Sequence, residues 1–324
     1  MSSRSAVRAP HPIEKANGFA ADVLSGLGAK PKRLPPKYFY DLAGSSLFDR
    51  ITELPEYYPT RAELGLLHEH APAIASLFPP GAALIEFGSG SSRKARILLS
   101  AAASVEAYVP IDISGDFLRE DSARLRRDLP HLTILPVVAD FTVMTAPPSE
   151  IALRPRAGFF PGSTIGNFEP HEACAFLRRA GQILGPGSVL VVGIDLEKSP
   201  DILYRAYNDA EGVTAKFNLN VLARINRELG ANFDLDAFEH HAFYNGERHR
   251  IEMHLASTRR QKVRLRGATF EFRAGESIHT ENSYKYSIDS FQALAHGSGW
   301  SPLQAWTDGL FSVHALRMTD DQND

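Results

Sequence analysis

Apolar and polar residues follow two different rhythms along residues 82–196. Short apolar runs, which predict buried strands, are separated by stretches with an apolar residue every three or four positions, which predict helices. The predicted strands are residues 83–87, 106–111, 132–139, 157–160 and 188–194. The predicted helices are residues 92–103, 115–128 and 170–185. Strands that alternate with helices form a parallel sheet with right-handed crossovers, so we expect an α/β fold.

This rhythm stops near residue 197. Residues 201–230 predict mainly helix, and residues 241–274 predict antiparallel strands because apolar residues recur at every second position. The α/β rhythm returns with a predicted helix at 288–296 and strands near 303–307 and 311–318. An insertion between two sheet strands explains this order and predicts a second, discontinuous α+β domain. We expect this domain at 13–61 and 197–286, the first domain at 62–196 and 287–318, and flexible segments at 1–12 and 319–324.

Composition excludes several classes of protein. With 324 residues, 44% of them hydrophobic, the chain is long enough for two domains with proper cores. A net charge of −3 gives no electrostatic reason to expect nucleic acid or an anionic membrane as a partner. No apolar run is long enough for a membrane span, and no apolar signal region begins the chain. The single cysteine, Cys174, rules out an internal disulfide and fits a reducing cytoplasm, where we expect the protein.

Twelve histidines raise the question of a metal site. The close pairs are His68 with His70 and His240 with His241. Neither pair has the i,i+4 spacing that places two ligands on one helix face. We therefore expect both pairs to lie on the solvated surface and no metal to be bound.

The first predicted strand ends in a glycine turn, at Glu86, Gly88 and Gly90. A strand that turns through glycines into a helix brings backbone N–H groups close to a ligand, at the edge where open α/β sheets bind cofactors. The dinucleotide fingerprint requires a third glycine, and Arg93 stands in its place. The turn alone leaves the cofactor open, because isolated glycine turns are often structural.

Two acids follow the next two predicted strands. Asp112 ends the second strand, 22 residues after Gly90, where it can hold ribose hydroxyls. Asp140 ends the third strand, where it can meet an adenine edge, with Phe141 beside the ring. Each acid alone could cap a helix instead. The turn Glu86-Phe-Gly-Ser-Gly90 resembles the first motif of S-adenosylmethionine (SAM)-dependent methyltransferases. Together with this turn, the two acids favour SAM as the cofactor.

Lys94 opens the first predicted helix of this region. Positive charge is disfavoured at a helix N-terminus, so a carboxylate partner is expected for Lys94. The methionine carboxylate of SAM and a surface ion pair are equally good candidates.

Several long motifs resemble those of the histidine-specific SAM-dependent methyltransferases. They occupy residues 38–49, 54–61, 162–167, 205–218 and 280–285. Members of that family methylate the α-amino group of L-histidine three times to give hercynine, an early step of ergothioneine biosynthesis. The resemblance implies a Rossmann-like class I methyltransferase domain. It also implies a substrate-binding domain built from the N-terminal helices and the insertion.

The resemblance also implies site residues. The SAM site would use Tyr40, Phe48, Gly88, Lys94, Asp112, Asp140 and Phe141. The histidine site would use Tyr57, Asn167, Tyr207, Met253, Glu281 and Ser283. By resemblance, Asn167 and Tyr207 hold the substrate carboxylate, while Glu281 and Ser283 hold the imidazole. A carboxylate and a hydroxyl two positions apart in a strand share one face and suit the two ring nitrogens. Without the resemblance, residues 280–283 would be read as a polar turn.

The chemistry implied is an in-line displacement by a deprotonated amine, which requires mainly that the two reactants are aligned. Tyr40 or Phe48 can stabilise the sulfonium by cation–π contact. Neither a covalent nucleophile nor a metal is expected. Tyr57 is the first hypothesis for the group that accepts the amine proton, and Asn167 is the second residue expected to act in catalysis.

Three alternatives remain at this point. The same fold could make the betaine of another amino acid, such as tyrosine or tryptophan. An NAD-type oxidoreductase is a second alternative, which the missing glycine at Arg93 argues against. A SAM-binding module without activity is the third.

Overall fold

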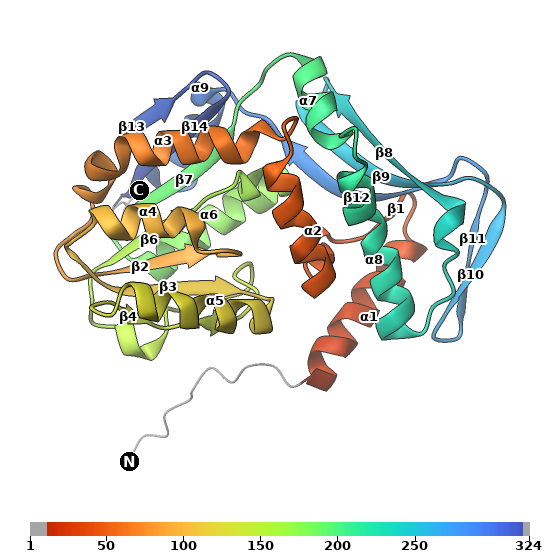
Figure 1. The fold of residues 1–324 in the computed structure, drawn as a ribbon, viewed down its shortest axis with the longest axis horizontal. Coiled ribbons are helices and arrows are strands. Elements are labelled where there is room, and N and C mark those ends of the chain that lie inside the picture. Colours follow the sequence, from red (N-terminus) through yellow and green to blue (C-terminus); the bar gives the residue numbers. More distant parts are fainter. Residues whose placement is uncertain (1–11, 320–324) are drawn as a thin grey trace. The chain divides into compact units, whose positions relative to one another are not determined.

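The computed structural model describes residues 12–319, with side chains from residue 18 onward (Figure 1). The predicted flexible segments at 1–12 and 319–324 lie outside the described residues, apart from their inner ends. The chain forms two compact units. The first unit contains Pro59–Glu197 and the chain from Lys285 onward, and the second contains the chain up to Tyr58 and Lys198–Tyr284. No described helix has both the length and the apolar character needed to cross a membrane.

The second unit combines helices with an antiparallel sheet. Its helices are α1 (Pro12–Gly28), η1 (Pro36–Phe39), α2 (Leu42–Glu53), α7 (Pro200–Tyr207), α8 (Val213–Leu229) and η4 (Leu235–Ala237). Its strands are β1 (Lys32–Arg33), β8 (Phe238–Asn245), β9 (Arg250–Ser257), β10 (Gln261–Leu265), β11 (Ala268–Phe272) and β12 (Ser277–Tyr284). The main sheet has the order β1-β12-β9-β8, and β10 and β11 form a separate hairpin. Helix α8 packs on β8 and β9, and it buries Val221 and Ile225, which are four residues apart on one helix face.

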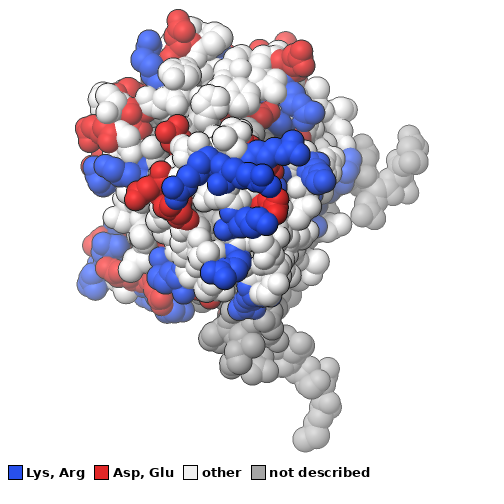
Figure 2. Space-filling model, turned by 90° about the vertical axis from the view of Figure 1, so that its right-hand side faces the viewer, with Lys and Arg blue, Asp and Glu red and all other residues white. Residues whose placement is uncertain are grey.

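Charges of both signs cover the surface of this part of the chain. Figure 2 shows a band of Lys and Arg side chains on one face, with Asp and Glu side chains around it. On the β10–β11 hairpin, Lys262 lies 2.6 Å from Glu271, and Arg259, which precedes the hairpin, pairs with Asp234. The basic side chains of the hairpin are therefore partly neutralised by acidic neighbours.

The first unit contains the predicted α/β sheet. Its strands are β2 (Ala82–Phe87), β3 (Val105–Asp112), β4 (Thr133–Ile134), β5 (Val137–Val138), β6 (Arg156–Phe160), β7 (Val189–Asp195), β13 (Trp300–Thr307) and β14 (Phe311–Met318). They run in the order β13-β14-β7-β6-β2-β3-β4, with β5 also paired to β3. The strands from β7 to β4 are parallel, and β14 and β13 are antiparallel to their neighbours. This is the Rossmann-like α/β sheet that the sequence predicts.

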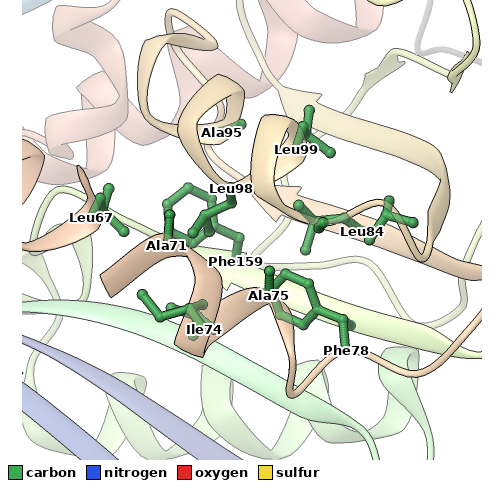
Figure 3. Packing of buried hydrophobic residues seen from close by; sticks show 14 of the residues in the cluster. Leu67, Ala71, Ile74, Ala75, Phe78, Leu84, Ala95, Leu98, Leu99 and Phe159 are labelled. Atoms are coloured by element: carbon green, nitrogen blue, oxygen red, sulfur yellow. The ribbon is translucent and has the colours of Figure 1, made fainter. Parts of the chain in front are cut away.

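Helices cover both faces of this sheet. They are α3 (Tyr58–Ala75), α4 (Arg93–Ala101), α5 (Gly115–Asp128), α6 (Pro170–Leu184) and α9 (Ile288–His296), with short turns η2 (Ser149–Ile151) and η3 (Thr164–Asn167). Leu67 of α3 and Leu98 of α4 pack with Leu84 of β2 in one buried cluster (Figure 3). Successive strand residues point to opposite faces, so Phe87 lies on the other side, edge-on to Phe176 of α6. Strand β2 is buried along its whole length, which fixes the glycine turn at its end.

Two details differ from the prediction. The strand expected at 132–139 is two short pieces, β4 and β5, because Pro136 has no N–H to continue the ladder with β3. Residues 280–283, which could have been a polar turn, lie inside β12. The register of β12 against β9 shifts between His279 and Glu281, so Thr280 is an extra residue in that strand.

Candidate active site

The glycine turn after β2 is held in a conformation that requires glycine. Gly88 and Gly90 have φ angles of 70° and 47°, which lie in the left-handed region. Gly88 N donates to Ile111 O at 2.9 Å, and Gly90 N donates to Asp112 Oδ2 at 3.0 Å. A Cβ atom on Gly88 would lie 3.2 Å from Phe141 Cε1. Three residues that the resemblance assigns to the SAM site, Gly88, Asp112 and Phe141, therefore lie at the same end of the sheet.

Asp112 and Asp140 each brace the turn that follows their strand. The Oδ1 atom of Asp112 accepts from Ser114 N at 2.8 Å, and Oδ1 of Asp140 accepts from Thr142 N at 2.9 Å. The capping role considered from the sequence is thus present at both positions. A carboxylate has about four lone-pair sites, so the bonds that Asp112 accepts from Gly90 N and Ser114 N leave capacity for ligand hydroxyls.

Lys94 has a carboxylate partner within the first unit. Its Nζ atom lies 2.6 Å from Oε2 of Glu63, which is buried in α3. Both Glu63 oxygens also accept from Gly162 N, at 2.9 and 3.0 Å. The surface ion pair considered for Lys94 is wrong, since the partner is almost fully buried. Glu63 connects the N-terminus of α4 with the loop after β6.

Glu86, the acid that precedes the glycine turn, is fully buried. Tyr108 donates its hydroxyl to Oε2 of Glu86, and Oε1 has no hydrogen-bond partner among the described residues. Burial raises the pKa of Glu86 well above its ordinary value, while the hydrogen bond from Tyr108 opposes this effect. Glu86 is therefore a buried partner of Tyr108 and does not face a ligand.

Asn167 ends η3, in the loop that follows β6. The loop starts with Gly162 at φ 79° and Ser163 at φ 54°, a left-handed angle that is uncommon for a residue with a side chain. Ser163 is fixed there because its Oγ atom accepts from Asp195 N at 2.9 Å. Asp195 in turn binds Lys285 Nζ at 2.7 Å, and both side chains are almost fully buried. The position of Asn167 thus depends on a buried polar network.

In the second unit, four assigned aromatic residues form a continuous series. The ring of Phe48 is edge-on to Tyr40 at 5.6 Å and to Tyr57 at 6.3 Å between centroids. Tyr57 is in turn edge-on to Tyr207 at 6.4 Å. Phe217 of α8 packs against both Tyr40 and Phe48. Residues that the resemblance assigns to SAM and to histidine are therefore neighbours within this unit.

The remaining assigned residues share one face of the β9–β12 ladder. Glu281 is the register partner of Met253, and Ser283 is that of Ile251. Tyr207 donates its hydroxyl to Ser283 Oγ at 2.7 Å. The structure thus brings Tyr207, Met253, Glu281 and Ser283 together, as the spacing of Glu281 and Ser283 implies.

The assigned residues divide between the two units. Gly88, Lys94, Asp112, Asp140, Phe141 and Asn167 belong to the first unit, and Tyr40, Phe48, Tyr57, Tyr207, Met253, Glu281 and Ser283 belong to the second. Glu63, Phe217 and Asn218 were missed by the sequence analysis. Phe217 and Asn218 lie within the 205–218 motif, but no role follows from it for them, and Glu63 lies outside all of the motifs.

A group of three potential metal ligands lies on the opposite face of the β9–β12 ladder. Ligand atoms of Glu252, His254 and His279 lie within 4.8 Å of one another. The two imidazole rings are stacked at 11°, with centroids 4.7 Å apart. Lone pairs of ring nitrogens lie in the ring planes, so those of nearly parallel rings do not converge on one ion. Arg250 also binds Glu252, at 2.7 Å. This arrangement does not suit a metal.

The prediction of a solvated pair at His240 and His241 is wrong for His240. His241 is exposed, but His240 is half-buried, and both of its ring nitrogens have partners. The two side chains differ because successive residues of β8 point to opposite faces of the sheet.

Comparison with known proteins matches residues 19–318 to the family described as histidine-specific methyltransferase, SAM-dependent. A histidine N-alpha-methyltransferase of Mycobacterium tuberculosis is 43% identical, over 89% of this chain and 90% of that protein. One from Mycolicibacterium smegmatis is also 43% identical, over 90% of this chain and 92% of that protein. Ergothioneine biosynthesis protein 1 of Neurospora crassa is 31% identical over 88% of this chain, which spans 33% of that protein. The family match runs through both units.

Proposed function

The chain belongs to the histidine-specific, SAM-dependent methyltransferases, and from this we propose that it transfers methyl groups from SAM to the α-amino nitrogen of L-histidine. Three successive transfers give hercynine, as in ergothioneine biosynthesis. The observation that carries the proposal is that Glu281, Ser283 and Met253 share one face of the β9–β12 ladder. The chain that holds them is 43% identical to histidine N-alpha-methyltransferases. The oxidoreductase and the inactive binding module are therefore set aside.

For SAM, we propose the glycine turn and its neighbours in the first unit. Gly88 has a left-handed backbone, and a Cβ atom there would press on Phe141, so a glycine at this position fits close approach of a ligand. Asp112 would hold the ribose hydroxyls and Asp140 the adenine, with Phe141 against the ring. Lys94 would bind the methionine carboxylate while it stays paired with Glu63. Tyr40 and Phe48 complete the proposed set from the second unit. SAM supplies the electrophilic methyl group.

For histidine, we propose the polar and aromatic residues around β12. Glu281 and Ser283 would bind the two imidazole nitrogens, one by accepting and one by donating a hydrogen bond. Met253, which is buried, would line the imidazole from the paired strand. Tyr207 and Asn167 would hold the substrate carboxylate.

Catalysis would follow mainly from alignment. Holding the amine lone pair in line with the methyl group can lower the barrier by roughly 7–11 kcal/mol. We propose Tyr57 as the acceptor of the amine proton, because its ring is edge-on to both Phe48 and Tyr207. Tyr57→Phe should then lower kcat at neutral pH by at least about 100-fold, an effect of the size expected for general-base catalysis. Full kcat of this variant from about pH 7 to about pH 9 would show that Tyr57 is not the base.

We expect the reaction to need no metal, nucleic acid or membrane, and to take place in the cytoplasm. This expectation is supported by the net charge of −3, the single cysteine and the parallel imidazole rings of His254 and His279. Activity should survive dialysis against a metal chelator. Loss of activity that added metal restores would contradict the expectation.

The direct test is mass spectrometry of free amino acids incubated with SAM and the enzyme. Histidine should gain three methyl groups. Glu281→Gln should lower kcat/KM for histidine by roughly 10- to 100-fold, because a hydrogen bond to a charged group is worth about 1.5–3 kcal/mol. A kcat/KM for tryptophan or tyrosine at or above that for histidine would support the alternative betaine-forming enzyme instead. An indole or phenol presents no pair of ring nitrogens for Glu281 and Ser283.

A further inference from the structure

Asn218 joins three strands beneath the proposed histidine site. It lies on α8 and has no exposed surface. Its Nδ2 atom donates to His254 O at 3.0 Å and to His240 Nδ1 at 2.9 Å. Its Oδ1 atom accepts from Thr280 Oγ1 at 2.8 Å. A buried side-chain amide with both N–H groups satisfied allows little freedom to the segments that it binds.

These partners fix the tautomer of His240. Its Nε2 atom lies 2.9 Å from Tyr207 O, and a carbonyl can only accept, so Nε2 carries the hydrogen. Nδ1 is then the acceptor for Asn218. Burial lowers the pKa of His240, which keeps the ring neutral, while the bond to Tyr207 O opposes this effect. Asp209 favours the protonated ring and His241 disfavours it.

The network ends at the residues proposed to bind histidine. His240 holds the backbone of Tyr207, whose hydroxyl donates to Ser283. Thr280 is the extra residue of β12 immediately before Glu281, and its hydroxyl also lies 3.0 Å from Met253 O. One chain of hydrogen bonds therefore connects the last turn of α7 with the irregular part of β12.

We propose that Asn218 and His240 are positioning residues that fix Tyr207 and Glu281 relative to each other, and so set the affinity for histidine. The inference rests on the proposed function, since it concerns the same site. Neither residue is assigned a contact with the substrate. Their effect acts through the backbone of Tyr207 and through the bulge before Glu281.

The test compares three variants of the full chain. His240→Ala removes both hydrogen bonds, and His240→Gln retains a donor that can reach Tyr207 O. His241→Gln is the matched control, because His241 is the adjacent histidine of β8 and is exposed on the other face. Steady-state rates give KM for histidine, KM for SAM and kcat. Nitrogen NMR of the protein with labelled histidine rings shows which nitrogen of His240 carries the hydrogen. The His240 signal is the one that is missing from the spectrum of His240→Gln.

His240→Ala should raise KM for histidine roughly tenfold, the loss expected for one or two buried hydrogen bonds, and change kcat and KM for SAM by less than about threefold. His240→Gln should recover most of the affinity, and His241→Gln should match the wild type. Partial unfolding alone would lower kcat and leave both KM values unchanged. The wild-type ring should carry its hydrogen on Nε2.

An unchanged KM for histidine in His240→Ala, or a ring with its hydrogen on Nδ1, overturns this inference while the proposed function stands. A wild type that does not methylate histidine overturns both. The two failures are distinguished by the wild-type assay alone.

Discussion

The Oε2 atom of Glu63 lies 2.6 Å from Nζ of Lys94, with the carboxylate almost fully buried. Lys94 opens helix α4, where the helix dipole disfavours a positive charge, and Glu63 compensates for it. The same carboxylate accepts from Gly162 N. One buried acid therefore supports both the proposed cofactor lysine and the loop that leads to Asn167.

This ion pair should show strong coupling in a double-mutant cycle. Glu63→Gln should lower the free energy of unfolding by about 2–4 kcal/mol, because it leaves the partly buried charge of Lys94 without its carboxylate partner. The double variant, Glu63→Gln with Lys94→Met, should lose less stability than the two single variants lose together. We expect a difference of at least about 1 kcal/mol. Both tryptophans, Trp300 and Trp306, lie on β13, so tryptophan fluorescence in urea reports the first unit.

The exposed pair of Arg119 and Asp116 provides the control for this cycle. Asp116→Asn should leave the unfolding midpoint unchanged, since exposed pairs contribute little. Additive effects of Glu63→Gln and Lys94→Met would show that the two charges do not interact as the distance indicates.

Gly88→Ala tests the proposed cofactor turn. The new Cβ would lie 3.2 Å from Phe141 Cε1, on a backbone with φ 70°. We expect at least about tenfold weaker binding of S-adenosylhomocysteine in calorimetry, because Phe141 must move. The left-handed strain itself costs about 1–2 kcal/mol of stability.

Gly187→Ala separates strain from packing. Gly187 has φ 69°, and its Cβ would meet no atom within 4 Å. This variant should lose similar stability and keep its affinity for S-adenosylhomocysteine. Equal affinities of the two alanine variants would argue against a cofactor site at the turn.

Tyr207→Phe tests the hydroxyl pair on the second unit. It removes the 2.7 Å bond to Ser283 Oγ and should raise KM for histidine by roughly five- to tenfold. Tyr204→Phe is the control, because Tyr204 lies on the same helix and is about half exposed. A KM for histidine that is equal in the two variants would remove Tyr207 from the proposed site.

The sequence predicts features that depend on local pattern. Strand β2, the turn at Gly88 and the acids at Asp112 and Asp140 follow from apolar runs and their ends, and the α/β class is confirmed. The break at Pro136 also has a local cause, since proline lacks an N–H. The apolar run around Pro136 nevertheless led to the prediction of one continuous strand.

Long-range polar contacts could not be predicted in this way. Glu63 and Gly162 are 99 residues apart, and Thr280 and Asn218 are 62 apart. His240 was expected at the surface because the His240–His241 pair lacks metal-ligand spacing, which says nothing about how each side chain packs. The different environments of the two side chains depend on which face of β8 packs against α8, and that is decided by the tertiary fold.

His314 should make the first unit sensitive to acid. It has no exposed surface, and burial lowers its pKa from 6.5 to about 4. Above about pH 7 the ring is neutral in both the folded and the unfolded chain, so it does not affect stability. As the pH falls below 6.5, the unfolded chain binds a proton that the folded chain cannot, and stability decreases until about pH 4. The total loss is about 3 kcal/mol.

Urea unfolding followed by tryptophan fluorescence, from about pH 7.5 to about pH 4.5, measures this loss in the first unit. His240, His254 and His279 also have lowered pKa values because of burial, but they lie in the second unit. In the wild type, His314 Nε2 lies 2.9 Å from Ser312 Oγ. His314→Gln keeps a polar group near this hydroxyl, but the glutamine side chain cannot take up a proton. Its stability should therefore fall less steeply with acid than that of the wild type. Parallel pH curves for the two proteins would mean that His314 is not the group that resists protonation.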